Sequence, residues 1–283
     1  MITVSIVADS ICRGHRLTSF ILEYPRFIHS ELMTHRMLSR NAASSRAIPV
    51  ERMIDRILKQ PAEPVRWGAN QKGMQAAKDL EPEVAEACRE DWMAGLAAVL
   101  PHVRRMLDRG VHKQIANRLL EPWAHMQTLV SATEYANFFN LRCHPDAQPE
   151  FQALAYAMLR AYNRSTPAEL APGDWHLPFM RAGEFTELDV HARLKIAAAR
   201  AARTSYYNFD GTIDPAKDAE VHDKLTTSGH WSPMEHPAQA MDDERYEHTP
   251  WCGNFKGWVQ YRKLFPGESR NVLRPELANY KGE

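Results

Sequence analysis

The chain has 283 residues, enough for one large domain or two small ones. Hydrophobic residues make up 44% and charged residues 25%, which is typical of a globular protein and excludes an intrinsically disordered chain. Lysine and arginine number 35 and are balanced by 35 acidic residues, which argues against a dedicated nucleic-acid-binding domain, although a local basic cluster is still allowed.

The sequence has no run of about 18 apolar residues, and its first apolar stretch is too short for a signal peptide. We therefore expect a soluble, cytoplasmic protein without a membrane partner. The cysteines Cys12, Cys88, Cys143 and Cys252 form no C-x-x-C pair, so no cysteine-based metal site is predicted.

Two strands are predicted at the start of the chain, at residues 2–8 and 18–24, on either side of a turn around Gly14. Pro25 suits the first position of a helix, and the helical spacing of the apolar residues after it predicts that this helix continues to Arg36. Proline, glycine and asparagine predict a long loop over 60–75.

Helices dominate the rest of the prediction. Apolar spacing indicates a long helix over 82–109, with a potential break at Pro101, and further helices over 111–120, 127–142, 148–162, 188–204 and 216–228. A polar loop is predicted over 242–253. We therefore expect an α+β fold, a helix-rich single domain over 1–283 with a small, mostly antiparallel sheet.

The densest polar cluster covers residues 34–46. It combines arginines, which are forked donors, with small hydroxyl and amide side chains that allow close backbone approach; these are Arg36, Ser39, Arg40, Asn41, Ser44, Ser45 and Arg46. The combination suits phosphate or a nucleotide. A solvated helix end with its cap is the alternative interpretation.

The spacing within this cluster resembles the signature of the flavin-dependent thymidylate synthases, R-H-R-x-x-S-x-N-E-x-S-x-R. The chain keeps His35, Arg36, Ser39, Asn41, Ser44 and Arg46. It departs at Thr34, where the family has arginine, and at Ala42, where the family has glutamate.

Three further segments are similar to the same family. Residues 116–122 resemble an A-x-R segment that ends in leucine-proline, with Glu121 in place of the leucine. Residues 131–150 resemble its helix pair and keep Asn137, Arg142, Ala147, Gln148 and Glu150. Residues 229–236 resemble G-H-x-S-P-F-E-H and follow an A-R-x-S-like segment at 202–205.

The order of these segments differs from the family, in which the last two come first. The resemblance therefore implies a circular permutation or an internal duplication. A partial second copy of the signature lies at 257–270. We hypothesise that Gln260, Arg262 and Glu268 make good the groups that are missing at Glu31, Thr34 and Ala42. Both ends of the chain would then meet at one site, with Ser44 and Gln260 on the same side.

The resemblance implies FAD-dependent transfer of a one-carbon unit from methylenetetrahydrofolate to C5 of dUMP, giving dTMP, with NADPH as reductant. It assigns catalysis to Arg142 and Ser44, and nucleotide binding to Ser44, Arg46, Arg118, Arg142 and Gln260. It assigns cofactor binding to His35, Arg36, Asn41, Asn137, Ser232 and His236, the last two near the folate. It also implies a homotetramer with small-molecule partners, no nucleic-acid partner and no bound metal.

The departures leave alternatives open. Thr34 lacks the family's cation, and a carboxylate at Glu31 would repel an anion, so a related pyrimidine nucleotide or C5 hydroxymethylation is an alternative. A divalent-metal phosphohydrolase is another, on His191, His222, Asp223, His230 and His236. A nucleic-acid-binding module, based on the cluster at 34–46 with Phe138 and Phe139, is the third.

Overall fold

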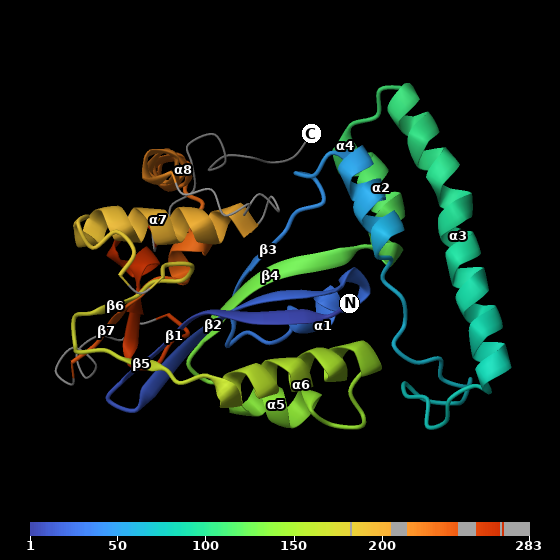
Figure 1. Cartoon of the computed structure of the whole chain (residues 1–283), viewed down its shortest axis with the longest axis horizontal. Helices are drawn as coiled ribbons and strands as arrows, with labels where there is room; N and C mark the ends of the chain where they lie inside the picture. The colour runs from blue at the N-terminus through green and yellow to red at the C-terminus, as the bar shows by residue number, and fades with distance from the viewer. Residues whose placement is uncertain (182, 205–213, 243–252, 267, 269–283) are drawn as a thin grey trace, which may run out of the picture.

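The computed structural model describes residues 1–181, 183–204, 214–242, 253–266 and 268 (Figure 1). It begins with the predicted hairpin of β1 (Thr3–Cys12) and β2 (His15–Pro25), which pair antiparallel. The two-residue turn puts Arg13 at φ 48° and Gly14 at φ 80°, the left-handed geometry that a tight hairpin requires. The two strands are longer than the sequence pattern predicted.

The hairpin forms the centre of a five-stranded sheet in the order β3-β4-β2-β1-β5. The other strands are β3 (Ser39–Ala42), β4 (His125–Ala132) and β5 (Ala168–Glu169). Neighbouring strands are antiparallel except β5, which runs parallel to β1. The α+β class and the mostly antiparallel sheet are confirmed.

The predicted helix over 127–142 is wrong in its first half. Strand β4 occupies this part, and only α5 (Ala136–Arg142) is helical. Strand β4 lies between β2 and β3, and nearly all of its residues are buried. A strand that is covered on both faces loses the polar-apolar alternation that identifies strands in a sequence.

The predicted helix from Pro25 to Arg36 is also too long. The chain forms a 3-10 turn over Arg26–Ile28 and one short helix, α1 (His29–Leu32). The Thr34 hydroxyl then donates to the Glu31 carbonyl at 2.7 Å, and the chain turns into β3. The cluster at 34–46 therefore joins the sheet instead of forming the end of a helix.

Most other helices lie where they were predicted. These are α3 (Pro82–Asp108), α6 (Pro149–Arg164), α7 (Val190–Arg203) and α8 (Pro215–Thr227), and α3 continues through Pro101. Helix α2 (Val50–Lys59) was not predicted. The predicted helix over 111–120 is α4 (Lys113–Ala116) followed by the 3-10 helix η2 (Asn117–Trp123). None of the helices in the described ranges has the length and apolar character to cross a membrane.

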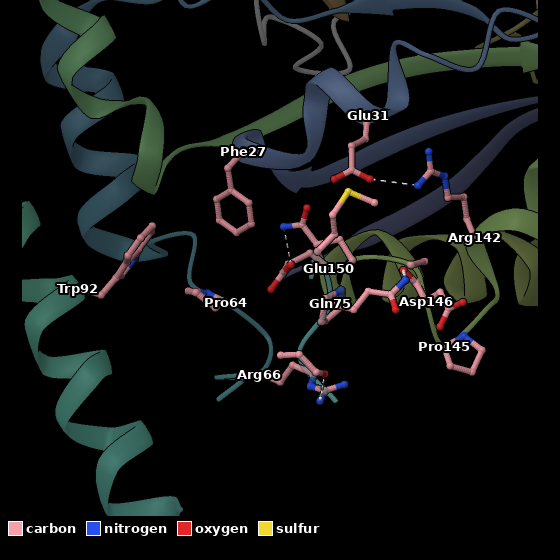
Figure 2. Close-up of a pocket in the computed structure, with 16 residues that line it drawn as sticks. Phe27, Glu31, Pro64, Arg66, Gln75, Trp92, Arg142, Pro145, Asp146 and Glu150 are labelled. Atoms are coloured by element: carbon pink, nitrogen blue, oxygen red, sulfur yellow. Dashed lines mark hydrogen bonds and ion pairs between the residues drawn. The ribbon is translucent and has the colours of Figure 1, made fainter. Parts of the chain in front are cut away.

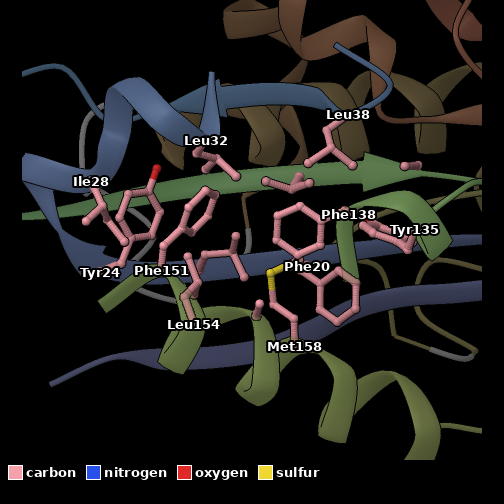
Figure 3. Close-up of a cluster of buried hydrophobic side chains, with 14 of the residues drawn as sticks. Phe20, Tyr24, Ile28, Leu32, Leu38, Tyr135, Phe138, Phe151, Leu154 and Met158 are labelled. Atoms are coloured by element: carbon pink, nitrogen blue, oxygen red, sulfur yellow. The ribbon is translucent and has the colours of Figure 1, made fainter. Parts of the chain in front are cut away.

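One face of the five-stranded sheet packs on α5 and α6 (Figure 1). Alternate residues of β2 point to this face, among them Phe20 and Tyr24, and they meet Phe138, Phe151 and Met158 from the two helices (Figure 3). All five are almost completely buried. Burial of apolar surface contributes roughly 25 cal/mol per Å² to the stability of a fold, so this core is the main interaction that holds the hairpin and α5 in place.

The opposite face of the sheet contacts the C-terminal part of the chain. There, β6 (Trp175–His176), β7 (Ala238–Ala240) and β8 (Trp258–Gln260) form a second, antiparallel sheet that the sequence pattern did not predict. Its strands have two or three residues, too short for a periodic signal. Most of the loop predicted over 242–253 lies outside the described residues.

Candidate functional site

Arg142 is held rigidly at the C-terminal end of α5. Its Nε donates to His35 Nε2 at 2.9 Å. Its NH1 donates to Glu31 Oε2 at 3.1 Å, the contact drawn in Figure 2. The guanidinium also lies 4.4 Å from the centroid of the Phe151 ring, a favourable cation–π position. Three contacts from three directions fix this cation while about a fifth of its side chain stays exposed.

The His35 ring is neutral at physiological pH, which allows it to accept a hydrogen bond from Arg142. Burial, together with the nearby charges of Arg142 and Arg40, lowers its pKa to about 4. The ring edge packs on Phe138 and Phe151, with centroids 4.9 and 5.8 Å away. The His35 ring is therefore anchored against the aromatic residues of the core between the sheet and α5 and α6, and from there it orients Arg142.

A cavity of about 630 Å³, here called the Arg142 cavity, opens beside this arginine. Figure 2 shows Arg142 and Glu31 on one side and Phe27 and Trp92 on the other. Glu150 lines it and is only 3% exposed. Its Oε1 accepts from the Val65 backbone N–H at 2.8 Å, and its Oε2 accepts from Gln148 Nε2 at 3.1 Å.

A second cavity, of about 380 Å³, lies next to the N-terminal cluster and is here called the cationic cavity. Four cations and one carboxylate line it: Arg36, Arg40, Arg262, Lys263 and Glu235. Arg262 and Lys263 are paired with carboxylates, Arg262 with Glu235 and with Glu268. Arg40 NH1 donates instead to backbone carbonyls, those of Met33 and His35 at 2.9 Å, and Arg36 is exposed. The cavity therefore carries excess positive charge.

Gln260 joins the C-terminal segment to the cluster at 34–46. It is 2% exposed, and its Nε2 donates to Ser39 Oγ at 3.0 Å and to Asn254 Oδ1 at 2.8 Å. Gly253 allows this approach, since a Cβ there would lie 2.2 Å from Gln260 Oε1. The structure thus brings Gln260 to the strand that leads to Ser44. Two of the positions at which the chain lacks the family's group behave differently. Glu31 pairs with Arg142, and Thr34 hydrogen-bonds to the Glu31 carbonyl and supplies no cation.

Asn41 and Ser232 also meet, from segments 191 positions apart. Ser232 Oγ donates to Asn41 Oδ1 at 3.2 Å, while Asn41 Nδ2 donates to the Ala201 carbonyl at 2.6 Å and to Thr204 Oγ1 at 3.1 Å. Strand β3 is therefore fastened to the end of α7 and to the 3-10 helix η4 (Ser232–Glu235). Both side chains use their polar groups in this junction.

His236 is completely buried at the other side of this junction. Its Nδ1 lies 2.9 Å from Ser131 Oγ, which also contacts Ser19 Oγ. Ser19 Oγ in turn lies 2.8 Å from His176 Nε2, so two histidines and two serines form one buried chain. Burial lowers the pKa of both histidines to about 3. Among the residues that the structure describes, His236 Nε2 finds no hydrogen-bond partner.

Ser44, Arg46 and Arg118 lie on a third part of the surface. Ser44 is half-buried, Arg46 is exposed, and Arg118 NH1 donates to Glu121 Oε1 at 2.7 Å. The same oxygen accepts from Ser45 Oγ at 3.1 Å and pairs with Arg26 NH2 at 2.9 Å. Glu121 was visible in the sequence only as a departure from leucine, and nothing there indicated its three partners.

The predicted residues therefore fall into separate groups. His35 and Arg142 touch, Arg36 and Gln260 share the cationic cavity, and Asn41 and Ser232 touch. Ser44, Arg46 and Arg118 form the surface group around Glu121, and Asn137 is exposed on α5. Phe151 is a contact whose importance only the folded chain reveals, because it lies outside the motifs that contain His35 and Arg142.

His222, one of the histidines proposed for a metal site, has other partners. His222 Nδ1 lies 2.9 Å from Asp223 Oδ1, and His222 Nε2 lies 3.2 Å from the Tyr261 hydroxyl. Among the residues that the structure describes, no three side chains of the His, Cys, Asp and Glu types come together as metal ligands.

Comparison with known proteins assigns the chain to a family. The model of the thymidylate synthase complementing protein family matches residues 10–168, more than half of the chain. No curated protein matches. Two solved structures of the UMP/dUMP methylase PolB from Streptomyces cacaoi, bound with 5-Br dUMP or 5-Br UMP, are 18% and 19% identical with TM-scores of 0.47. They cover 58% of this chain and 90% and 89% of their own chains.

The match and the site define an enzyme of the thymidylate synthase-like methyltransferase type. The chain belongs to the thymidylate synthase complementing protein family, the flavin-dependent thymidylate synthases. The matched residues include the signature at 34–46 and the segments around Arg118 and Arg142. The segments at 202–205, 229–236 and 257–270 lie beyond the match, so the permuted or duplicated order stays a prediction.

Proposed function

We propose that the protein transfers a one-carbon unit from methylenetetrahydrofolate to C5 of dUMP in an FAD-dependent reaction that gives dTMP. The observation that carries this proposal is the fixed guanidinium of Arg142 beside a cavity. For C5 of a uracil ring to act as a nucleophile, electron density must build up in the ring, and the ring carbonyl oxygens carry much of this negative charge. A cation that is already oriented stabilises that charge without reorganisation, which lowers the barrier to attack.

The orientation of Arg142 supports this role. Glu31 and His35 take its NH1 and Nε, and Phe151 covers one face of the guanidinium. Its NH2 makes no hydrogen bond or ion pair within the described residues and is the group that we assign to the pyrimidine carbonyl edge. A neutral His35 can accept the hydrogen bond from Arg142 Nε, which a ring protonated at both nitrogens could not.

Ser44, Arg46 and Arg118 are proposed to hold the phosphate and sugar of the nucleotide. Exposed forked donors beside a small hydroxyl suit a phosphate dianion. Glu121 fixes the neighbouring Arg118. Gln260 is proposed to support this binding indirectly, because both donors of its amide are already used within the protein. Ser44, in the same loop as Arg46, is proposed to touch the reacting nucleotide.

The side chains around the cationic cavity fit FAD. Arg36 and Arg40 supply charge that no carboxylate neutralises within the described residues, which suits a diphosphate. The unpartnered, buried Nε2 of His236 is a second polar group suited to a ligand. We assign His35, Asn41, Asn137 and Ser232 to the same cofactor, the buried ones as supports. When bound, the flavin supplies the hydride that converts the transferred methylene to a methyl group.

The remaining expectations belong to the same proposal. NADPH is proposed as the source of reducing equivalents, and the active form is proposed to be a cytoplasmic homotetramer of a single-domain chain. Within one chain, the Arg142 cavity and the surface group around Ser44 are separate. A closed symmetric assembly is one way in which such separate groups are brought to one site.

A second candidate is C5 methylation or hydroxymethylation of a related pyrimidine nucleotide. Thr34 hydrogen-bonds to its own helix and supplies no cation, and the Glu31 carboxylate stands beside Arg142. Because the Glu31 carboxylate is a hydrogen-bond acceptor beside the Arg142 donors, the site could bind a pyrimidine edge different from that of dUMP. Reaction products distinguish the two candidates.

The test is a reconstituted reaction. The purified protein is mixed with FAD, and its visible spectrum is recorded before and after dUMP is added. Methylenetetrahydrofolate and NADPH are then supplied, and the nucleotide product is identified by mass. The proposal predicts a bound-flavin spectrum that dUMP perturbs, and dTMP as product. A 5-hydroxymethyl product or turnover of UMP alone would establish the second candidate, and a protein that binds neither FAD nor dUMP would overturn both.

A further inference from the structure

A third cavity, of about 540 Å³, lies where the first turns of α7 meet the second sheet and is here called the α7 cavity (Figure 1). Trp175 of β6 and Gln239 of β7 are directly opposite in register, so both side chains stand on one face of this sheet and form one wall. Val190 and Arg193 of α7 form another. None of the described residues that line it lines the Arg142 cavity or the cationic cavity.

The rim of the α7 cavity is held in place by hydrogen bonds. The turn over 171–174 is fastened to β7, because the Gly173 N–H donates to the Ala240 carbonyl and the Ala240 N–H donates to the Asp174 carbonyl, both at 2.9 Å. The side chain of Gln239 adds a third bond, from its Nε2 to the Gly173 carbonyl at 2.9 Å. The cavity is therefore preformed, and a ligand would lose little affinity to the ordering of its walls.

Arg193 brings an unpaired cation to the α7 cavity. Its Nε is buried and donates to no acceptor within the described residues, and no carboxylate in that part of the chain forms an ion pair with its guanidinium. A buried N–H group without an acceptor is costly in the folded protein. The parallel N–H groups of a guanidinium match the two oxygens of a carboxylate, so Arg193 suits a ligand that carries one.

Asp174 supplies the opposite charge. Its Oδ2 accepts from the Ala171 N–H at 2.9 Å, which orients the carboxylate. Asp174 and Arg193 are the two charged side chains among the described residues that line the cavity, yet they form no ion pair with each other. Their formal charges cancel. An inorganic anion would meet Asp174 and a simple cation would meet Arg193, so the lining favours a ligand that carries both charges.

The remaining wall of the α7 cavity is apolar. Trp175, Leu177 and Val190 line it and also pack against the buried cluster that contains Leu194 and Tyr261. The Trp175 ring makes an edge contact with Tyr261, with centroids 5.9 Å apart and planes at 87°. A rigid aromatic surface favours a ligand with an apolar side chain, and the volume is that of a small-molecule site.

We infer that the α7 cavity binds a free amino acid with a large apolar side chain. Arg193 binds its carboxylate, Asp174 accepts from its ammonium group, and Trp175 contacts its side chain. The carboxylate contributes more than the ammonium group, because Arg193 Nε is buried whereas Asp174 is exposed and its charge is screened by water. The ligand is neither a substrate nor a cofactor of the proposed reaction, and the inference does not depend on that reaction.

The inference is tested by calorimetric titration of the purified full-length protein with L-phenylalanine, without FAD or nucleotide. Wild-type protein is expected to bind it. Phenethylamine, which lacks the carboxylate, should bind at least about tenfold more weakly, and hydrocinnamate, which lacks the ammonium group, several-fold more weakly. Absence of L-phenylalanine binding, equal binding of either analogue, or tighter binding of inorganic phosphate would overturn the inference.

Two variants test the two charges. Arg193→Gln should weaken L-phenylalanine binding about tenfold or more, and Asp174→Asn several-fold. Arg164→Gln at the end of α6 and Asp108→Asn at the end of α3, both exposed, are the matched controls and should bind like wild type.

A folding defect is distinguished from a lost ligand contact by the stability of Arg193→Gln. Because the Arg193 guanidinium has no partner within the described residues, its replacement should leave the circular dichroism spectrum and the urea midpoint nearly unchanged. Wild-type affinity in this variant, or weaker binding that is matched by a lower urea midpoint, would overturn the inference. The titration requires neither FAD nor dUMP, so its failure leaves the proposed function standing.

Discussion

Gln260 donates a hydrogen bond to Ser39 across 221 positions of sequence, with 3.0 Å between Nε2 and Oγ. Ser39 opens β3 inside the signature, and Gln260 closes β8 in the partial second copy. The C-terminal segment, which lies beyond the family match, therefore completes the surroundings of the signature. The two ends of the enzyme form one structural unit at this contact.

Loss of this contact should destabilise the protein. Gln260→Leu removes both donors and leaves Ser39 Oγ and Asn254 Oδ1 with unsatisfied positions, at a cost of about 1–3 kcal/mol in the free energy of unfolding. Urea titration followed by circular dichroism measures the change. Gln71→Leu, whose amide bonds to Gln75 on the surface, is the control and should be nearly neutral. Equal values for the two variants would mean that Gln260 does not fasten the C-terminal segment.

The buried histidines predict a loss of stability in acid. The pKa of His176 and of His236 is lowered to about 3, so both stay neutral in the folded protein at pH 5. In the unfolded chain they titrate near 6.5 and are protonated at that pH. The unfolded state then binds more protons, and the free energy of unfolding should fall as the pH drops below about 6.5, by about 2 kcal/mol per histidine at pH 5.

Urea titrations at pH 7.5, 6 and 5 measure this dependence. His176→Gln should reduce the slope between pH 6.5 and 5, while His191→Gln, on an exposed position of α7, should leave it unchanged. A free energy of unfolding that does not vary over this range would show that the buried chain from His236 to His176 is not neutral in the folded state.

Arg118 should matter for the nucleotide and not for the flavin. Its exposed guanidinium is held by Glu121, at a distance from the cationic cavity. Arg118→Ala should raise the dissociation constant for dUMP about tenfold and leave that for FAD unchanged. Arg104→Ala, another exposed arginine, serves as control. An equal loss of both affinities would indicate misfolding, and no loss of either would remove Arg118 from the site.

The Glu31 carboxylate should weaken binding of an anionic nucleotide. Glu31→Gln keeps an acceptor for Arg142 and removes one negative charge, so dUMP should bind several-fold more tightly, with the largest gain at low salt. Glu51→Gln, in the first turn of α2, is the control. Weaker binding by Glu31→Gln would instead show that the carboxylate accepts a hydrogen bond from the base, which favours a different pyrimidine edge.

The sequence predicted the hairpin, the four long helices and the family, because each leaves a local signal. The apolar spacing of α6 and the turn at Gly14 can be recognised without any partner. Strand β4 could not, since its burial on both faces arises from β2 and β3. The signature identified His35, and the separate segment at 131–150 identified Arg142. Their contact, and the binding of Arg26 and Ser45 to Glu121, depend on packing between distant segments.

The most direct test of the account is the turnover of Arg142→Ala in the reconstituted reaction. The variant should keep its FAD spectrum and lose at least about 100-fold in rate, because the oriented cation beside the pyrimidine is gone. Arg160→Ala, exposed on α6, should retain wild-type turnover. Arg142→Lys, which keeps the charge without the fork, should recover a small part of the rate. Full activity in Arg142→Ala, with flavin bound, would contradict the account.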